Sequence, residues 1–474
     1  MNMRKTKIIC TIGPACDDYE VLKEMALAGM NCCRLNFSHG NHEQQLVRIN
    51  NIKKLREELG IPLPILLDTK GPEVRFGDFK GGKAMLKKGQ TFTILPDASV
   101  LGDETKGGIT FGELYRSALP GVIILVDDGK IQLEVKEVTL DKEIVCKVLN
   151  DGVVSNHKSL NVPNVDIKMP YLSDTDIADI EFGIEQGIDI IAASFARSAY
   201  DILKLRTLLG KLNADNILII SKIENTQGIK AAEEILAVSD GLMVARGDLG
   251  VEVDFSRLPT LQKELISKCY HAGKIVVTAT QMLESMTSNP RPTRAETSDV
   301  ANAIYDKTSA TMLSGETAAG QYPVEAVKTM AKIIENTEKA INFENRFYQH
   351  HLLLGKGITS AICSATAESS FKMNAKAIIT VTKNGITAKK IAAYQPACPI
   401  IAAVLSEKAY HQLGAVWGVV PFRAEELKTT DEIIQNGIRI AIESGLVKKG
   451  DTVIITGSSA VGRGGTDMMQ IYQI

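Results

Sequence analysis

The sequence is poor in aromatic residues and contains no long apolar run. Of its 474 residues one is tryptophan, and Phe, Trp and Tyr together make up 5%. A membrane-spanning helix needs about 20 consecutive, mostly apolar residues, and no run here approaches that length. The first residues lead into a predicted strand without the apolar segment of a secretory signal. We therefore expect a cytoplasmic protein with no membrane contact.

Neither charge sign predominates, and the cysteines form no motif. The chain has 54 Lys and Arg residues against 56 Asp and Glu residues, for a net charge of −2. This balance gives no general attraction to nucleic acid, which we do not expect as a partner. The eight cysteines lack the spacing of a metal site and the density of a disulfide scaffold. We expect them to be reduced core residues.

Short β-branched runs alternate with amphipathic helical segments along much of the chain. Eight alternating units favour an α/β fold of the (β/α)8 TIM barrel type, whose functional sites gather at the carboxyl ends of the strands. The predicted barrel strands are residues 7–12, 31–37, 64–68, 189–195, 217–223, 241–245, 274–279 and 310–313.

Two further regions depart from this alternation. Residues 71–167 read as short strands with a turn at 127–130, which predicts a small β-barrel lid domain inserted at the active end of the barrel. A passive insertion is the alternative. After a polar stretch at 342–351 the α/β pattern resumes. We expect a catalytic barrel from 1–70 and 168–341, a lid from 71–167 and an open α/β regulatory domain from 342–474.

Charged residues end two successive predicted strands of the barrel. Lys222 and Glu224 are two residues apart, so strand periodicity places both on one face. Asp248 follows the next strand in a glycine-flanked turn. The two carboxylates could hold Mg²⁺ or Mn²⁺ through oxygen, with Lys222 on a phosphate or enolate oxygen. A structural ion pair is the alternative.

The second and third strands add a group of polar residues. Arg34, Asn36 and Ser38 share a strand face, and Asp68 and Thr69 end the next strand. Their oxygens suit a monovalent cation, while the Arg34 guanidinium is suited to phosphate. Capping of local turns is the alternative for each of them.

Three weaker signals lie at other predicted strand ends. Arg75 follows the third strand at the hinge of the lid, where an ordinary surface arginine is the alternative. Thr278 and Thr280 are expected on one face of the seventh strand, with Thr280 as a proton relay. Ser314 and Glu316 follow the eighth strand and are expected to support the site from behind.

One loop of the C-terminal region is typical of phosphate binding. It precedes a predicted helix, so backbone amides, hydroxyls and an ammonium could surround a phosphate. A plain helix cap is the alternative. The residues are Thr382, Lys383, Asn384, Gly385 and Thr387.

Seven stretches together resemble the pyruvate kinase family over nearly the whole chain. The resemblance implies phosphoryl transfer from phosphoenolpyruvate to ADP with Mg²⁺ and K⁺, a sugar-phosphate or nucleotide effector, and a homotetramer. The stretches are 6–14 (Thr-Lys-Ile-Ile-Cys-Thr-Ile-Gly-Pro), 34–40 (Arg-Leu-Asn-Phe-Ser-His-Gly), 67–75 (Leu-Asp-Thr-Lys-Gly-Pro-Glu-Val-Arg), 221–225 (Ser-Lys-Ile-Glu-Asn), 243–252 (Met-Val-Ala-Arg-Gly-Asp-Leu-Gly-Val-Glu), 278–286 (Thr-Ala-Thr-Gln-Met-Leu-Glu-Ser-Met) and 313–318 (Leu-Ser-Gly-Glu-Thr-Ala).

The resemblance also implies a role for each matching residue. Lys222, Arg34 and Thr280 would be catalytic, with Lys222 and Arg34 on the transferring phosphoryl and Thr280 in the proton path to the enolate carbon. Gly247 and Asp248 would offer amides to the substrate carboxylate. The other implied sites are Glu224 and Asp248 for Mg²⁺ (or Mn²⁺), Asn36, Ser38, Asp68 and Thr69 for K⁺, Asn36, His39 and Arg75 for the nucleotide, and the loop 382–387 for an effector.

Three positions bear on which kind of member this is. Glu73 stands where potassium-independent members typically carry lysine, so we expect potassium dependence. Ser198 stands where many members have a lysine associated with nucleotide phosphate, and Gln44 where vertebrate members have a tyrosine near the base. Nucleotide affinity and preference are therefore left open.

Two other functions remain as alternatives. One is a barrel aldolase in which Lys222 forms a Schiff base, although the neighbouring Glu224 favours a charged lysine. The other is an inactive sensor of phosphorylated metabolites on the same scaffold. The presence of the two acids, Lys222 and Arg34 disfavours it.

Overall fold

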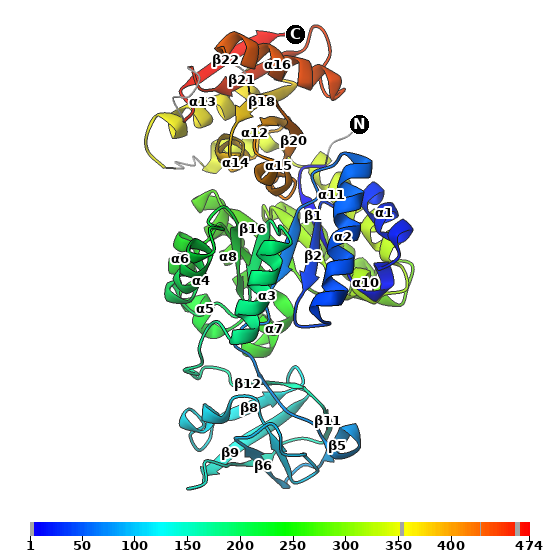
Figure 1. Ribbon diagram of the computed structural model, residues 1–474, viewed down its shortest axis with the longest axis vertical. Helices are drawn as coiled ribbons and strands as arrows, with labels where there is room; N and C mark the ends of the chain where they lie inside the picture. Colours follow the sequence, from blue (N-terminus) through cyan, green and yellow to red (C-terminus); the bar gives the residue numbers. More distant parts are fainter. Residues whose placement is uncertain (1–3, 351–354, 427, 460–464) are drawn as a thin grey trace.

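The computed structural model describes residues 4–350, 355–426, 428–459 and 465–474. Within these residues, eight parallel strands close into a barrel, and two smaller domains lie at its opposite ends (Figure 1). One is a curled mixed β-sheet and the other is an open α/β domain. The fold class expected from the sequence is confirmed.

The barrel strands are short runs that are buried on both faces. Their inner face fills the barrel and their outer face packs on helices, so apolar residues occupy successive positions. All six residues of β14 are buried, for example. Strand β1 pairs with both β2 and β17, which closes the ring. The strands are β1 (Lys7–Thr11), β2 (Cys32–Asn36), β3 (Ile65–Asp68), β13 (Ile190–Ala193), β14 (Leu218–Ile223), β15 (Gly241–Ala245), β16 (Ile275–Ala279) and β17 (Ala310–Leu313).

Helices cover the outside of the barrel, and side-chain caps fix where several of them begin. Asp18 accepts the backbone N–H groups of Glu20 and Val21, and Ser173 forms a capping box with Asp176. The barrel helices are α1 (Tyr19–Ala28), α2 (His42–Leu59), α3 (Asp174–Glu185), α4 (Ala199–Lys211), α5 (Thr226–Lys230), α6 (Ala232–Val238), α7 (Arg246–Glu252), α8 (Leu258–Ala272), α9 (Arg294–Tyr305), α10 (Gly315–Ala318) and α11 (Pro323–Lys339).

The inserted lid lies beyond the carboxyl ends of the barrel strands, because the chain enters it directly after β3. Its sheet curls around a core of its own, in which Phe76 and Phe92 meet edge to face. Asp127 and Asp128 have positive φ, as a tight hairpin turn requires. The sheet order is β4 (Val74–Arg75), β12 (Ser159–Asn161), β8 (Ile123–Val126), β9 (Ile131–Val138), β10 (Ile144–Val148), β6 (Thr91–Leu95) and β7 (Lys106–Gly108), and β11 (Gly152–Ser155) pairs with β5 (Lys83–Leu86).

The C-terminal domain lies at the opposite end of the barrel, with α14 and α15 nearest to the barrel (Figure 1). Its sheet has the order β20-β19-β18-β21-β22, and β22 is antiparallel to β21. The elements are α12 (Phe343–His350), α13 (Ile358–Lys372), β18 (Ala377–Thr382), α14 (Ile386–Ala392), β19 (Ile400–Val404), α15 (Glu407–Leu413), β20 (Val419–Arg423), α16 (Thr430–Glu443), β21 (Thr452–Gly457) and β22 (Met468–Gln473).

The cysteines agree with the compositional expectation. All eight cysteines are buried free thiols, as expected for core residues. Among the described residues, none of the helices combines the length and the apolar character that crossing a bilayer demands.

Candidate active site

Lys222 occupies the centre of a buried charge cluster at the carboxyl ends of the barrel strands. Its Nζ lies 3.0 Å from Oδ1 of Asp68, 2.8 Å from Oγ of Ser194 and 2.9 Å from Oε1 of Glu224. Burial opposes the charge of Lys222, but the carboxylates of Asp68 and Glu224 outweigh it and raise the pKa of Lys222 above its usual value. The ammonium is therefore charged and fixed by three oxygens.

Asp68 connects this lysine to an arginine on the neighbouring strand. Nε of Arg34 donates to Oδ2 of Asp68 at 2.6 Å, and Nη1 of Arg34 donates to Oγ1 of Thr11 at 2.8 Å. Burial alone would raise the pKa of Asp68, but Arg34 and Lys222 hold it below its ordinary value. The Nη2 group of Arg34 donates to none of the described residues, so it is open to an added anion.

Glu224 has one oxygen bound and one oxygen without a hydrogen-bond donor. Oε2 accepts the backbone N–H of Phe195 at 2.6 Å. Oε1 is fully buried and receives no hydrogen bond, although Lys222 Nζ lies close to it. Burial raises the pKa of Glu224 to about 8, since the attraction of Lys222 is opposed by the negative charge of Asp248. A buried oxygen that accepts no hydrogen bond is suited to binding a cation.

Asp248 supplies the second acid of the expected metal site. It lies in the first turn of α7, directly after β15, where the sequence predicted a glycine-flanked turn. Its carboxylate accepts no hydrogen bond from a described residue. No three His, Cys, Asp or Glu side chains cluster as a metal site in the described parts of the chain. Mg²⁺ often takes only one or two carboxylates and completes its shell with water and substrate oxygens, so this pair fits it.

The expected monovalent-cation residues lie on neighbouring strand ends, with most of their oxygens in local hydrogen bonds. The backbone N–H of Ser38 donates to Oδ1 of Asn36 at 3.1 Å, and Asn36 is aligned with Asp68 across the sheet. Oγ1 of Thr69 accepts the N–H of Ser194 at 3.1 Å. These contacts are compatible with a cation site and with a local turn, so the potassium assignment remains a prediction.

Thr280 differs from its expected position. Strand β16 ends at Ala279, and Thr280 has φ +66°, so it does not continue the strand face that carries Thr278. Thr278 is buried and bonded to Thr308 at 2.9 Å. Oγ1 of Thr280 accepts the N–H of Gly247 at 2.8 Å. The left-handed turn therefore places Thr280 beside the start of α7, and the Gly247 amide is available to a substrate only if Thr280 releases it.

Arg75 and His39 lie at the entrance between barrel and lid. Nη2 of Arg75 lies 2.7 Å from Oε2 of Glu73, and Nη1 of Arg75 donates to the carbonyl of His157 at 2.8 Å. The exposed His39 has its pKa lowered by partial burial and by the positive charges of Arg75 and Arg34. The entrance therefore carries positive charge, which suits a phosphorylated ligand.

The two positions that depart from the family pattern have structural roles. Ser198 caps α4 by accepting the N–H of Asp201 at 3.4 Å. Oε1 of Gln44 accepts the N–H of Asn41 at 3.2 Å in the capping box of α2. In each case one side-chain oxygen caps a helix.

Several residues of the site were not found by sequence reasoning. Ser194 joins Asp68 to Lys222, but it lies just beyond β13, where strand periodicity no longer indicates direction. Thr11 faces Arg34 across the β1–β2 pair and could have been found from that register. Glu316, which was expected behind the site, accepts the backbone N–H groups of Leu283 and Ser314, and its supporting role stays a prediction.

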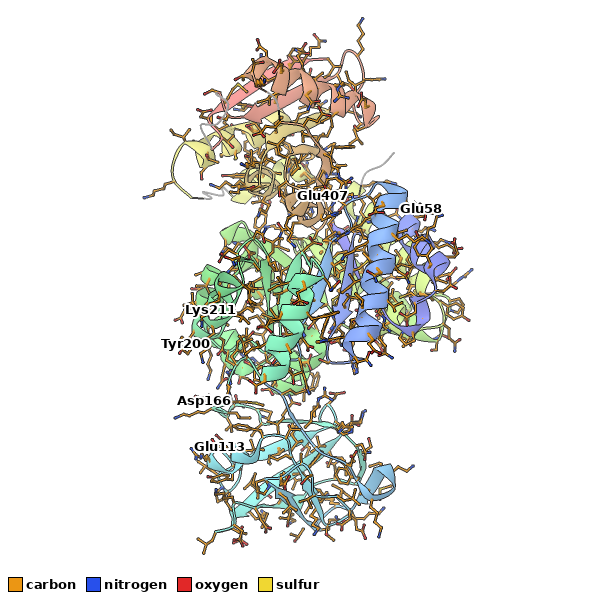
Figure 2. The ribbon with its side chains drawn as sticks, viewed as in Figure 1. Glu58, Glu113, Asp166, Tyr200, Lys211 and Glu407 are labelled. Carbon is orange, nitrogen blue, oxygen red and sulfur yellow. The ribbon has the colours of Figure 1, made fainter. Side chains whose placement is uncertain are left out.

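The lid contacts the barrel through polar side chains. Nδ2 of Asn161 in the lid donates to Oε1 of Glu252 at 3.1 Å, one helical turn after Asp248. Asp166, which lies where the lid meets the barrel (Figure 2), accepts a hydrogen bond from Nε2 of Gln227 at 2.8 Å. The lid is thus attached to the same helix that carries the second acid.

The expected effector loop borders a cavity of about 570 Å³ in the C-terminal domain. Oγ1 of Thr382 accepts the N–H of Gly385, whose φ is +74°. Oγ1 of Thr387 bonds to Oγ1 of Thr466 at 2.6 Å. Lys383 and Asn384 line the same cavity and are exposed. All five predicted loop residues are thereby gathered at one end of α14.

Comparison with known proteins gives consistent matches along the chain. Residues 3–327 match the family "Pyruvate kinase, barrel domain", and residues 360–472 match "Pyruvate kinase, alpha/beta domain". A pyruvate kinase of Clostridium acetobutylicum is 44% identical over 100% of both chains. One of Geobacillus stearothermophilus is 49% identical over 99% of this chain and 80% of its own length. A crystal structure of a pyruvate kinase from Cryptosporidium parvum superposes with a TM-score of 0.93 at 38% identity, covering 99% of this chain and 96% of that one.

Proposed function

Because the chain belongs to the pyruvate kinase family, whose members transfer a phosphoryl group from phosphoenolpyruvate to ADP, we propose that the cluster around Lys222 carries out this transfer. The observation that carries the proposal is the Lys222 ammonium, held by Asp68, Ser194 and Glu224 at the carboxyl ends of three neighbouring strands. Phosphoryl transfer depends mainly on positioning and on preorganised charge, and this arrangement provides both.

Lys222 and Arg34 bind the phosphoryl group that is transferred. Lys222 is fixed by three oxygens, so its charge needs no rearrangement when the reaction begins. It also stabilises the negative charge of the enolate that remains when the phosphoryl group leaves. Arg34 is fixed by Asp68 and Thr11 and has one nitrogen open to a phosphate oxygen.

Glu224 and Asp248 would hold Mg²⁺, or Mn²⁺, at the other side of the substrate. The orphaned Oε1 of Glu224 and the nearby half-buried carboxylate of Asp248 in the first turn of α7 are the observations that fit such an ion. When bound, the ion supplies positive charge to the oxygens of the substrate and of the transferring group. Backbone amides of Gly247 and Asp248 are the donors proposed for the substrate carboxylate.

Thr280 belongs to the path by which the enolate carbon receives its proton. A threonine hydroxyl does not ionise at neutral pH, so it acts by relaying a proton between water and substrate. Its Oγ1 donates to the carbonyl of Ala279 and accepts from Gly247. Substrate binding at the Gly247 amide would free one lone pair of Thr280 for this relay.

Asn36, Ser38, Asp68 and Thr69 form the proposed potassium site. Glu73 supports potassium dependence, because burial raises the pKa of this carboxyl, the charge of Asp248 adds to that rise, and Arg75 offsets the two effects only in part. An added monovalent cation offsets such a charge near a phosphate. Asn36, His39 and Arg75 are the residues proposed to contact ADP.

The lid and the C-terminal domain have supporting roles in this proposal. The lid closes over the site and expels water, which would otherwise compete for the phosphoryl group. The loop formed by Thr382, Lys383, Asn384, Gly385 and Thr387 binds a sugar-phosphate or nucleotide effector. We propose that the protein acts in the cytoplasm as a homotetramer.

The test is a measurement of pyruvate formed from phosphoenolpyruvate and ADP. We expect product with Mg²⁺ and K⁺ together, and little when Mg²⁺ is chelated. An aldolase would instead give a covalent adduct at Lys222 upon borohydride reduction with substrate, and we expect none. Failure to form pyruvate in a protein that still binds phosphoenolpyruvate would favour the inactive sensor.

A further inference from the structure

A second cavity lies between the barrel and the C-terminal domain, at the end of the barrel away from the charge cluster. Its volume is about 250 Å³. The barrel side is formed by residues at the amino ends of strands, including Leu218, Asp240 and Lys274. The other side is α14, which faces the barrel in Figure 1. The proposed function uses none of the residues on the barrel side.

The charges around this cavity are unbalanced. Four lysines line it, at positions 274, 307, 389 and 390, against one acid, Asp240. Asp240 is already paired with Arg206 at 2.6 Å and also accepts the N–H of Ile219. Asp240 also attracts Lys274 and Lys389, but as one acid among four lysines it leaves the cavity with an excess of positive charge.

The lysines differ in how far their own hydrogen bonds are satisfied. Lys274 donates to the carbonyls of Leu236, Ala237 and Ser239, so it contributes charge only. Lys389 on α14 is partly buried and makes no hydrogen bond or ion pair with a described residue. Burial lowers its pKa, and the attraction of Asp240 offsets only part of this effect. An ammonium in this position gains from an anion brought to it.

The rest of the wall is apolar and partly aromatic. Tyr270, Ile275, Val416 and Trp417 line the cavity together with Ala393. The volume exceeds what one phosphate group needs, and the apolar wall gains by covering a carbon skeleton. The cavity therefore combines a cationic group that can bind an anion with space for an apolar body.

We propose that this interdomain cavity binds a small phosphate ester with a compact apolar body, whose phosphate group contacts Lys389. The site is distinct from the effector cavity, although Ile386 and Lys390 on α14 line both. A ligand in either cavity would therefore lie against the same short helix, α14. The proposal does not depend on the reaction at Lys222.

The only tryptophan of the chain, Trp417, provides a direct reporter because it lies in the cavity wall. The full-length protein is titrated with phenyl phosphate at constant ionic strength, and fluorescence excited at 295 nm is recorded. We expect a saturable change. Inorganic phosphate and phenol, which each lack half of the ligand, should bind at least about tenfold more weakly.

Variants decide where the probe binds. Lys389→Gln should weaken binding of phenyl phosphate at least about tenfold, since it removes a charged hydrogen-bond donor. Ala393→Leu keeps every lysine but fills the space, and should weaken it too. Lys383→Gln is the matched control, because Lys383 lines the effector cavity only. The proposal would be overturned if folded Lys389→Gln bound phenyl phosphate as tightly as the parent protein. It would also be overturned if only Lys383→Gln lost affinity, or if inorganic phosphate bound as tightly as phenyl phosphate.

Discussion

Replacing Lys222 with methionine tests the proposed site most directly, because the change removes one charge and keeps most of the volume. The ammonium is the shared partner of Asp68 and Glu224, which are both almost fully buried. Lys222→Met leaves these carboxylates without their cation. The substitution should therefore affect stability as well as catalysis, and the two effects can be measured separately.

The expected magnitudes follow from the two roles of the ammonium. Breaking a buried ion pair by removing one partner typically costs about 3–5 kcal/mol of folding free energy. Arg34 still neutralises Asp68, so it is mainly Glu224 that loses its partner. We therefore expect the loss of folding free energy to lie near the lower end of this range. Removing a preorganised charge from a transition state typically lowers kcat by about 100- to 1,000-fold. We expect kcat to fall by at least 100-fold.

The assay combines pyruvate formation with urea unfolding, each with and without Mg²⁺. Mg²⁺ should stabilise Lys222→Met more than the parent protein, because the ion takes over part of the missing charge beside Glu224. Lys230→Met, at an exposed lysine in the following helix, is the matched control and should change neither property. Activity of Lys222→Met within tenfold of the parent would refute the catalytic role. Unchanged stability would refute the burial argument.

Three further changes test separate parts of the structure. Ser194→Ala removes the hydroxyl between Asp68 and Lys222, and should lower kcat about tenfold with the fold intact by circular dichroism. The parent should lose most activity when Na⁺ replaces K⁺, and Glu73→Lys should restore it; full parent activity in Na⁺ would contradict the inference. Burial lowers the pKa of His411 from 6.5 to about 4. Between these two pH values the imidazole is therefore protonated in the unfolded chain but not in the folded one. Stability should therefore fall by about 2 kcal/mol from pH 7 to pH 5 in urea titrations, and His411→Gln should lack this part of the slope.

The barrel could be predicted from the sequence because its strands are buried on both faces. Such strands appear in the sequence as uninterrupted β-branched runs. Each of the eight predicted runs contains one barrel strand, and the predicted and observed ends differ by at most two residues. Within a strand, side-chain direction alternates strictly. For this reason Lys222 and Glu224 were expected together, and their charged groups do lie 2.9 Å apart.

The direction in which a side chain points could not be predicted where a strand ends, because the two-residue alternation of the strand is lost there. Thr280 follows Ala279 by one residue, and its positive φ turns it away from the face of Thr278. Ser194 follows the end of β13 and turns toward Asp68 and Lys222. Both residues lie at the carboxyl end of a strand, where tertiary packing determines the backbone. The residues that carry chemistry are thus among the hardest to place from sequence.

A purely structural role for the cluster conflicts with the state of Glu224. In a buried ion pair kept for stability we expect the buried oxygens to be hydrogen-bonded, because an unsatisfied buried oxygen costs free energy. Here Asp68 accepts hydrogen bonds from both Arg34 and Lys222, whereas Oε1 of Glu224 has only the ion pair with Lys222 at 2.9 Å and accepts no hydrogen bond. Burial raises the pKa of that carboxyl to about 8, which means that the site as folded disfavours its negative charge. An arrangement that leaves one buried oxygen unsatisfied beside a second acid, Asp248, is stabilised by a bound cation, and this is the property that a metal-assisted transfer requires.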